Sequence, residues 1–240
     1  MDIDRNESRD LSDMRFVSNG ERVPFRCQLC GRCCKNAVDF VMLEPPDIFN
    51  LTRHLKALDD SIAGTEDVLE KYAHPIVIAE GFPVFVLNAE GAEQACIFLK
   101  DSRCTVYYAR PRVCRLYPFG VVPGSKGRDF SYYLCTEKQH HFGSGIVKAG
   151  DWISANFSKE EREYLKADYD FLAVFGKAIR SIGEERFRHI LFQFLYYRYY
   201  NFDLKQPFLP QYYENTETLM ELLSKAADGG GDRCTRWKSG

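Results

Sequence analysis

The sequence predicts an α+β protein in which helix predominates, with an irregular cysteine-rich region packed against a helical half. Three observations support this prediction. Eight of the nine cysteines lie within the first 135 residues. In the same part of the chain, short apolar runs between turn-forming residues are typical of brief strands. After Gly150 the apolar residues recur at helical spacing instead, which predicts two structurally different halves.

The composition is that of an ordinary globular protein. Its 240 residues are enough for one substantial core, or for a core with an appended helical lobe. The net charge of −2 argues against nucleic-acid binding by bulk electrostatic attraction. No apolar run approaches the roughly 18 residues of a membrane-spanning helix, and the charged start lacks the apolar stretch of a secretion signal. We therefore expect a cytoplasmic protein with no nucleic-acid partner and no membrane partner.

The pattern along the chain divides it into four parts. Residues 1–24 are polar and predict a flexible N-terminal arm. Residues 25–150 contain the cysteine-rich region, and residues 151–225 form an aromatic-rich helical region. The glycine-containing residues 226–240 predict a flexible tail. The two middle parts are expected to form the folded body.

One helix and several strands are predicted within the cysteine-rich region. Glu44-Pro-Pro-Asp47 is typical of a helix start, with proline in the first turn and an acid to meet the helix dipole. Pro83–Leu87 is typical of a buried strand, and Cys96–Leu99 and Phe130–Leu134 are typical of short strands. A cysteine lies at or just beyond one end of each short strand, so these strands are expected to position thiols.

The helical half begins with a clear start signal. Ser158-Lys-Glu-Glu161 is a capping box, in which the serine accepts a backbone hydrogen bond and the glutamate reaches back to the start of the helix. The spacing predicts a helix from there to about Ile182, ended by Gly183.

A second helix is predicted after Gly183. It carries an aromatic stripe from Phe187 to Tyr200, which is more typical of a buried core than of a base-stacking surface. Pro207 and Pro210 are expected to end this helix. Asn215–Lys225 predicts a last short helix.

The cysteines between residues 27 and 34 carry the strongest chemical signal. Cys27-Gln-Leu-Cys30-Gly-Arg-Cys33-Cys34 places four thiols within eight residues. A Cys-x-x-Cys turn brings two sulfurs within reach of one ion, and Gly31 permits the tight backbone that such a turn needs. Adjacent residues do not easily direct both side chains at one small ion. Cys33 and Cys34 are therefore expected to have different roles.

A second group of thiols lies further along the chain. Three arginines, Arg110, Arg112 and Arg115, flank one of them, and their charge would lower a thiol pKa and offset an anionic thiolate cluster. The alternative is that these arginines lie on a solvated face and form ordinary ion pairs. The members of this second group are Cys96, Cys104, Cys114 and Cys135.

Disulfide bonds are the simplest alternative explanation for the cysteines. Disulfide-stabilised scaffolds are short, secreted and richer in cysteine than this chain. In a reducing compartment such closely spaced thiols indicate a metal site or catalysis. The residues therefore predict a thiolate-bound metal centre, to which all eight cysteines from Cys27 to Cys135 are candidate ligands.

These motifs resemble a known family, the cysteine-cluster proteins described as zinc- or iron-chelating. The resemblance consists of Cys-x-x-Cys-x-x-Cys-Cys, then Cys-x-Phe-Leu, then Cys-x-Val-Tyr-x-x-Arg-Pro-x-x-Cys-Arg-x-Tyr-Pro-Phe. Residues 27–34 and 96–119 carry nearly all of it, and Cys135 with Gly143-Ser-Gly145 forms a weaker last element. One branch of the family is known as flagellin lysine N-methylases, and the aromatic helical half is similar to that type of longer member.

The identity of the metal stays open at this stage. Eight thiolates are enough for two zinc sites of four cysteines each, or for one iron–sulfur cluster, such as 4Fe–4S, with supporting thiols. All-sulfur ligation suits both metals. The Cys-x-x-Cys-x-x-Cys run with its flanking arginines favours iron–sulfur by a small margin.

Three functions are compatible with these patterns. The first is an iron–sulfur protein with a redox or structural role, acting on a redox partner, and an oxidoreductase if it is catalytic. The second, implied by the resemblance, is an S-adenosylmethionine-dependent methyltransferase acting on a protein lysine, although the chain lacks a glycine-rich cofactor fingerprint. The third is a zinc-stapled interaction protein without catalysis. No catalytic residue is assigned.

The histidines and the last cysteine contribute less to the prediction. His140-His141 follows Cys135 closely enough to lend a ligand, but loop histidines of this kind are more often solvated. His54, His74 and His189 are expected to be structural or exposed, and Cys234 lies in the predicted tail outside the family pattern.

Overall fold

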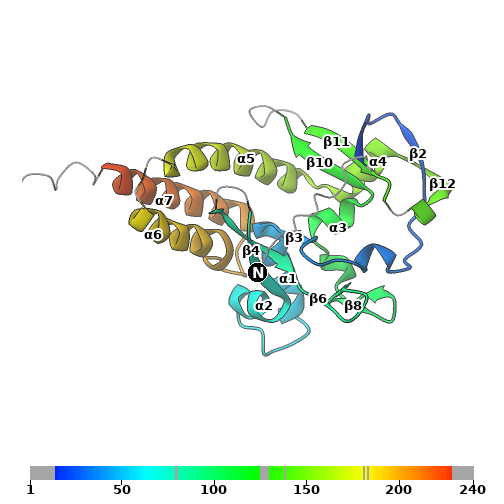
Figure 1. The fold of residues 1–240 in the computed structure, drawn as a ribbon, viewed down its shortest axis with the longest axis horizontal. Helices are drawn as coiled ribbons and strands as arrows, with labels where there is room; N and C mark the ends of the chain where they lie inside the picture. Colours follow the sequence, from blue (N-terminus) through cyan, green and yellow to red (C-terminus); the bar gives the residue numbers. More distant parts are fainter. Residues whose placement is uncertain are drawn as a thin grey trace, which may run out of the picture.

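A computed structural model describes residues 14–78, 81–124, 130–137, 139–180, 182 and 184–228 of the chain. Long helices pack together at one end of the molecule, and small separate sheets with short helices form the other end (Figure 1). The predicted α+β class with predominant helix is confirmed. The predictions that concern residues 1–13, Gly183, residues 229–240 and Cys234 lie outside the described residues.

Two sheets at the cysteine-rich end include residues from the expected N-terminal arm. Residues 14–24 are part of the fold, because β1 and β2 pair with later strands and bury Val17 and Val23. The arm prediction is therefore wrong for these residues, because pairing with distant strands such as β11 places them in the fold. The strands are β1 (Met14–Val17), β11 (Phe130–Cys135) and β10 (Phe119–Pro123), in the order β1-β11-β10, and β2 (Arg22–Phe25), paired with β12 (Phe142–Lys148).

A third sheet lies against the first two helices. The predicted buried strand Pro83–Leu87 is confirmed as β5, the central strand between β3 and β4. The predicted helix start is also confirmed, because Glu44 and Asp47 form a reciprocal capping box and the prolines occupy the first turn. These elements are β3 (Met42–Leu43), α1 (Pro45–Lys56), α2 (Thr65–Tyr72) and β4 (Ala73–Val77).

Two short hairpins follow, and both contain a cysteine. The expected strand over Cys96–Leu99 is divided between them, because residues 97 and 98 lie in the connection. Asp101 and Ser102 both have positive φ, as a two-residue hairpin turn requires. The elements are β6 (Ala89–Glu90) with β7 (Ala95–Cys96), β8 (Leu99–Lys100) with β9 (Arg103–Cys104), and then α3 (Arg112–Leu116).

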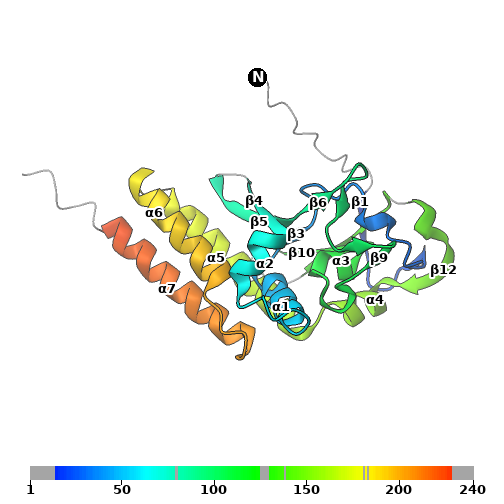
Figure 2. The ribbon, with the colours of Figure 1, turned by 90° about the horizontal axis from the view of Figure 1, so that it is seen from below.

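In the second half of the chain, three long helices (α5, α6 and α7) pack together with one π-helical segment, whereas the short helix α4 lies beside β12 at the cysteine-rich end (Figure 2). The predicted capping box is confirmed: the Ser158 hydroxyl accepts from the Glu161 N–H and the Glu161 carboxylate accepts from the Ser158 N–H. The last helix begins earlier than expected, because Pro210 lies in its first turn, where proline is tolerated. The elements are α4 (Ala149–Asn156), α5 (Lys159–Ile179), α6 (Glu184–Leu195), the π-helix Tyr196–Tyr200 and α7 (Phe208–Asp228).

The hydrophobic core joins the two halves. One cluster of buried side chains combines Phe25, Leu116 and Leu134 of the cysteine-rich end with Tyr164 and Tyr212 of the helices. Within the helical half, Arg198 forms a buried ion pair with Asp168 at 2.5 Å. No helix among the described residues is both long and apolar enough to cross a membrane.

Candidate metal sites

The Cys-x-x-Cys-x-x-Cys-Cys loop is shaped by its backbone. Gly31 adopts a left-handed conformation with φ 69°, and a Cβ at this position would lie 2.9 Å from the Ser102 carbonyl oxygen. Only glycine therefore lets the loop pack directly on the turn of the β8–β9 hairpin. The packing fixes the loop beside the strand that carries Cys104.

A 3₁₀ helix, Arg32–Cys34, follows the glycine. It places the Sγ atoms of Cys33 and Cys34 4.0 Å apart. The expectation that adjacent thiols face different places is wrong in its geometric premise, because this tight helical turn directs both sulfurs to the same side. Both thiols are half-buried.

The hairpin cysteines accept hydrogen bonds from the backbone. The backbone N–H of Phe98 donates to the sulfur of Cys96, and that of Val106 donates to the sulfur of Cys104. In each case the donor lies two residues after the cysteine. Such hydrogen bonds favour the charged thiolate over the thiol. Cys114 lies on α3 and is half-buried.

Five of the cysteines are close enough for the charge of one to change the pKa of another, and we call this group the thiol pocket. The adjacent Cys33 thiol and burial raise the pKa of Cys34. Burial, followed by the charges of neighbouring thiolates, raises the pKa of Cys114 well above its usual value. Burial also raises the pKa of both hairpin cysteines. A bound cation would offset this repulsion and favour the thiolates. The pocket comprises Cys33, Cys34, Cys96, Cys104 and Cys114.

The three arginines do not act on Cys114 as expected. Arg112 donates to the Glu44 carboxylate at 2.5 and 2.8 Å, and Arg115 pairs with Glu161. These two charges are compensated by carboxylates and do not lower the pKa of Cys114, which burial raises. Arg110 stacks on the Tyr107 ring at 3.7 Å. Its charge partly offsets the effect of burial on the pKa of Cys104.

A separate group of ligand atoms lies at the other end of the same loop, and we call it the Cys/His site. The Sγ of Cys30 is 3.3 Å from Nε2 of His141 and 3.5 Å from Nε2 of His140. The three ligand atoms all lie within 4.8 Å of one another. Among the residues that the structure describes, this is the one group of three or more cysteine, histidine or carboxylate ligand atoms with that spacing.

Strand pairing brings the members of the Cys/His site together. Phe25 of β2 pairs with Phe142 of β12, and the Arg26 N–H donates to the His141 carbonyl at 3.2 Å. The prediction that the two histidines are solvated is wrong for His141, which is 3% exposed. Their sequence gives no signal of this contact, since Cys30 and His140 lie 110 residues apart.

A tyrosine orients the buried histidine. The Tyr117 hydroxyl and Nδ1 of His141 are 3.2 Å apart, which leaves Nε2 facing Cys30. Burial, followed by the charges of nearby thiolates, raises the pKa of Tyr117, so the phenol stays protonated. A partner on the second ring nitrogen is the arrangement that fixes metal-ligating histidines in one tautomer.

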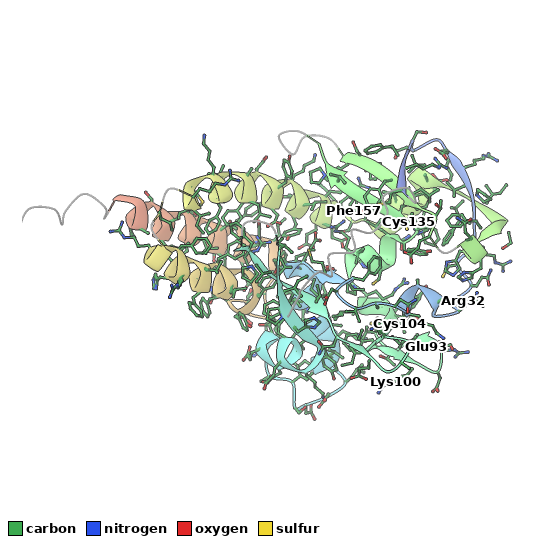
Figure 3. All side chains as sticks on the ribbon, viewed as in Figure 1. Arg32, Glu93, Lys100, Cys104, Cys135 and Phe157 are labelled. Carbon is green, nitrogen blue, oxygen red and sulfur yellow. The ribbon has the colours of Figure 1, made fainter. Side chains whose placement is uncertain are left out.

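The two remaining candidate cysteines are members of neither group, although the charge of Cys135 acts on Tyr117 together with those of Cys33 and Cys30. Cys27 is exposed at the start of the loop. Cys135 ends β11, in the upper part of Figure 3, apart from Cys104 in the hairpin below. The described structure therefore distributes the eight thiols over a five-thiol pocket, the Cys/His site and two separate positions.

A comparison with known protein families finds a match for the cysteine-rich part of the chain. Residues 26–141 match the sequence model of the CxxCxxCC family, described as "Putative zinc- or iron-chelating domain". The match covers a little under half of the chain and shows that its cysteine-rich segment is similar to this family. The matched segment contains the thiol pocket and ends at His141, so it includes the complete Cys/His site. No solved structure matches the chain.

Proposed function

We propose that this chain is an iron–sulfur protein whose cluster is bound in the thiol pocket. The observation that carries the proposal is the collection of five half-buried thiols whose charges act on one another. Four of them are enough to ligate a cluster, and the fifth would be a supporting thiol. The same residues are compatible with the broader family description of zinc or iron chelation.

The donor set and its surroundings fit a cluster. All five donors are sulfur, the ligand type of iron–sulfur clusters and of all-cysteine zinc sites. Backbone N–H groups donate to two of the sulfurs, and hydrogen bonds of this kind stabilise cluster thiolates and tune their potential. The pocket is also shielded, since its thiols are at most half-exposed and Phe98 and Val106 beside them are buried.

The spacing of the sulfurs favours a cluster over a single zinc ion. In a tetrahedral zinc site with bonds of about 2.3 Å, neighbouring sulfurs lie about 3.8 Å apart. The Cys33–Cys34 pair is close to this value, at 4.0 Å. Among the described residues, no third ligand atom lies within 4.8 Å of both sulfurs. A cluster presents several metal atoms to its ligands, so its thiolates lie farther apart than those of one ion.

The bound cluster would supply one-electron transfer. The residues of the chain would hold it, exclude water from it and set its charge balance through Arg110 beside Cys104. The buried Asp47 counts against a strongly positive environment, because its charge raises the pKa of Cys114. The protein is then a redox module whose partner is another protein.

The experiment is spectroscopy and metal analysis of protein purified without oxygen. We expect a broad visible absorption that bleaches on reduction, together with iron and acid-labile sulfide in cluster stoichiometry. Cys114→Ser is expected to abolish the absorption, because the charges of three other pocket cysteines, Cys96, Cys33 and Cys104, act on Cys114. Cys135→Ser is the matched control, since Cys135 is a half-buried cysteine outside the pocket. Colourless protein that contains zinc in the thiol pocket would refute the proposal.

A further inference from the structure

A second metal centre is indicated at the opposite end of the cysteine loop from the thiol pocket. We propose that Cys30, His140 and His141 form a mononuclear site for a zinc-class divalent cation, with the fourth coordination position open. This site is independent of the proposed cluster, because it shares no residue with the thiol pocket.

The distances fit one small ion. With zinc–sulfur bonds of about 2.3 Å and zinc–nitrogen bonds of about 2.0–2.1 Å, tetrahedral geometry places sulfur and nitrogen about 3.6 Å apart. The two distances from Cys30 Sγ to the histidine Nε2 atoms are 3.5 and 3.3 Å. These distances are also suitable for S–H···N contacts, so the ligand type and the support for the site must decide between the two.

The ligand type is that of a borderline-soft cation. One thiolate and two imidazoles suit zinc and related transition ions, whereas calcium and magnesium take oxygen ligands. The site has three protein ligands. This is also the number in zinc sites that keep one coordination position for water or substrate. The single thiolate only partly neutralises a divalent ion, so the ion would retain a net positive charge at the open position.

Hydrogen bonds and ring packing hold the ligand residues of this site in place. The Gln28 side chain donates to the His140 carbonyl at 3.2 Å, and the Arg26 N–H donates to the His141 carbonyl at 3.2 Å. These two bonds tie the histidine segment to the cysteine loop on both sides of the ligand atoms. Tyr117 and Phe25 pack edge-on against the His141 ring, with ring centroids 5.7 and 6.1 Å away. The histidine rings are therefore held where the ion would bind.

An entry path and an open side are present. Cys30 and His140 are half-buried, whereas His141 is buried behind them. Cys27, the other cysteine of the same Cys-x-x-Cys, is exposed and lies outside the group of three. Among the described residues no fourth ligand atom joins the group, so the fourth position is left for water or substrate.

The test is zinc K-edge absorption spectroscopy on the full chain, purified without oxygen and loaded with one equivalent of zinc. We expect a first shell of one sulfur, two imidazole nitrogens and one lighter atom. A shell with only sulfur would overturn the site, and a shell with two sulfurs would overturn its open position by identifying Cys27 as a ligand. This readout does not depend on iron, so it is separate from the test of the cluster.

Affinity measurements on variants complete the test. Competition with a chromophoric chelator should show zinc binding weakened at least about 100-fold by Cys30→Ser and by His140→Gln, because each removes a direct ligand. His54→Gln is the matched control, being a half-buried histidine outside the site. His140 is replaced instead of His141 because His141 is buried and its replacement would disrupt packing more. Circular dichroism verifies the fold of each variant. Unchanged zinc affinity in folded His140→Gln would overturn the proposal, and so would loss of the iron–sulfur absorption in folded Cys30→Ser, since the two centres would then be one.

Discussion

The thiol pocket and the Cys/His site lie on the same short loop but are assembled in different ways. The pocket collects thiols from a 3₁₀ helix, two hairpins and α3, and its donors are sulfur alone. The Cys/His site collects one thiol and two imidazoles through the pairing of β2 with β12. The thiolates of the pocket are like charges on several elements. The Cys/His site has one thiol, and the distances from its sulfur to the two histidine nitrogens suit one ion. If both proposals hold, one cysteine motif contributes ligands to two kinds of metal site.

The largest expected difference between the two sites is their response to metal removal. Air oxidation should destroy the proposed cluster and its colour but leave zinc at the Cys/His site, whereas a chelator such as EDTA should do the reverse. Loss of the cluster should also remove hydrogen-exchange protection from β6–β9, because hairpins with strands of two residues are not stable alone. Mass-spectrometric hydrogen exchange, with α5 as the internal reference, measures this effect. Simultaneous loss of both metals under either treatment would contradict the separation.

Gly31 lies between the two sites, and its replacement should affect both. Gly31→Ala is expected to destabilise the loaded protein by about 2–4 kcal/mol, because it adds left-handed backbone strain and a contact of the new Cβ with the Ser102 oxygen. The matched control is Gly91→Ala, where φ is +71° but no atom lies within 4 Å of the new Cβ. That variant should lose only about 1–2 kcal/mol. Denaturant unfolding measures both values, and equal losses would show that the close packing on the hairpin contributes nothing.

Tyr117 should distinguish the sites more selectively. Tyr117→Phe removes the hydroxyl that contacts Nδ1 of His141 and retains the ring. We expect zinc affinity to fall about 10–100-fold, with the cluster absorption unchanged, because the hydroxyl orients a ligand of only one site. The control is Tyr108→Phe, at a tyrosine that is 92% exposed. A shift of the cluster spectrum with intact zinc binding would reverse this assignment.

The smallest expected effect concerns the charge balance of the thiol pocket. Arg110→Gln removes the positive charge that favours the Cys104 thiolate, so it should make the reduction potential of the cluster more negative. For a partly exposed charge the expected shift is about 10–40 mV. Protein-film voltammetry measures it against Arg103→Gln, a change at an exposed arginine that precedes Cys104 on β9. A positive shift would contradict the role of Arg110.

The sequence was informative wherever the signal is local. The capping boxes at Glu44 and Ser158 and the buried strand Pro83–Leu87 are encoded by residues within a few positions of each other, and the structure contains all three. The matched family segment likewise follows from the spacing of the cysteines. Such features depend on backbone propensity and short-range hydrogen bonds, which a single sequence contains.

Features that depend on distant pairing were not predictable in the same way. The burial of His141 depends on the pairing of β12 with β2, which is more than 100 residues earlier in the chain. The strand β1 was missed because its stability comes from β11 rather than from its own four residues, of which one is buried. The buried Asp168–Arg198 pair was missed for a related reason: two charged residues on separate helices give no sign in sequence that they meet.

The pairing of β2 with β12 also determines how the family segment could be carried by other chains. Residue 26 is hydrogen-bonded to residue 141, so the segment begins and ends at one place in space. A unit with adjacent ends can be inserted into a surface loop of a different protein without distorting either partner. An ion shared by Cys30 and His140 would act as a clasp on this closed unit. It would close a loop of 110 residues, for which the loss of chain entropy in the unfolded state is worth about 4–5 kcal/mol.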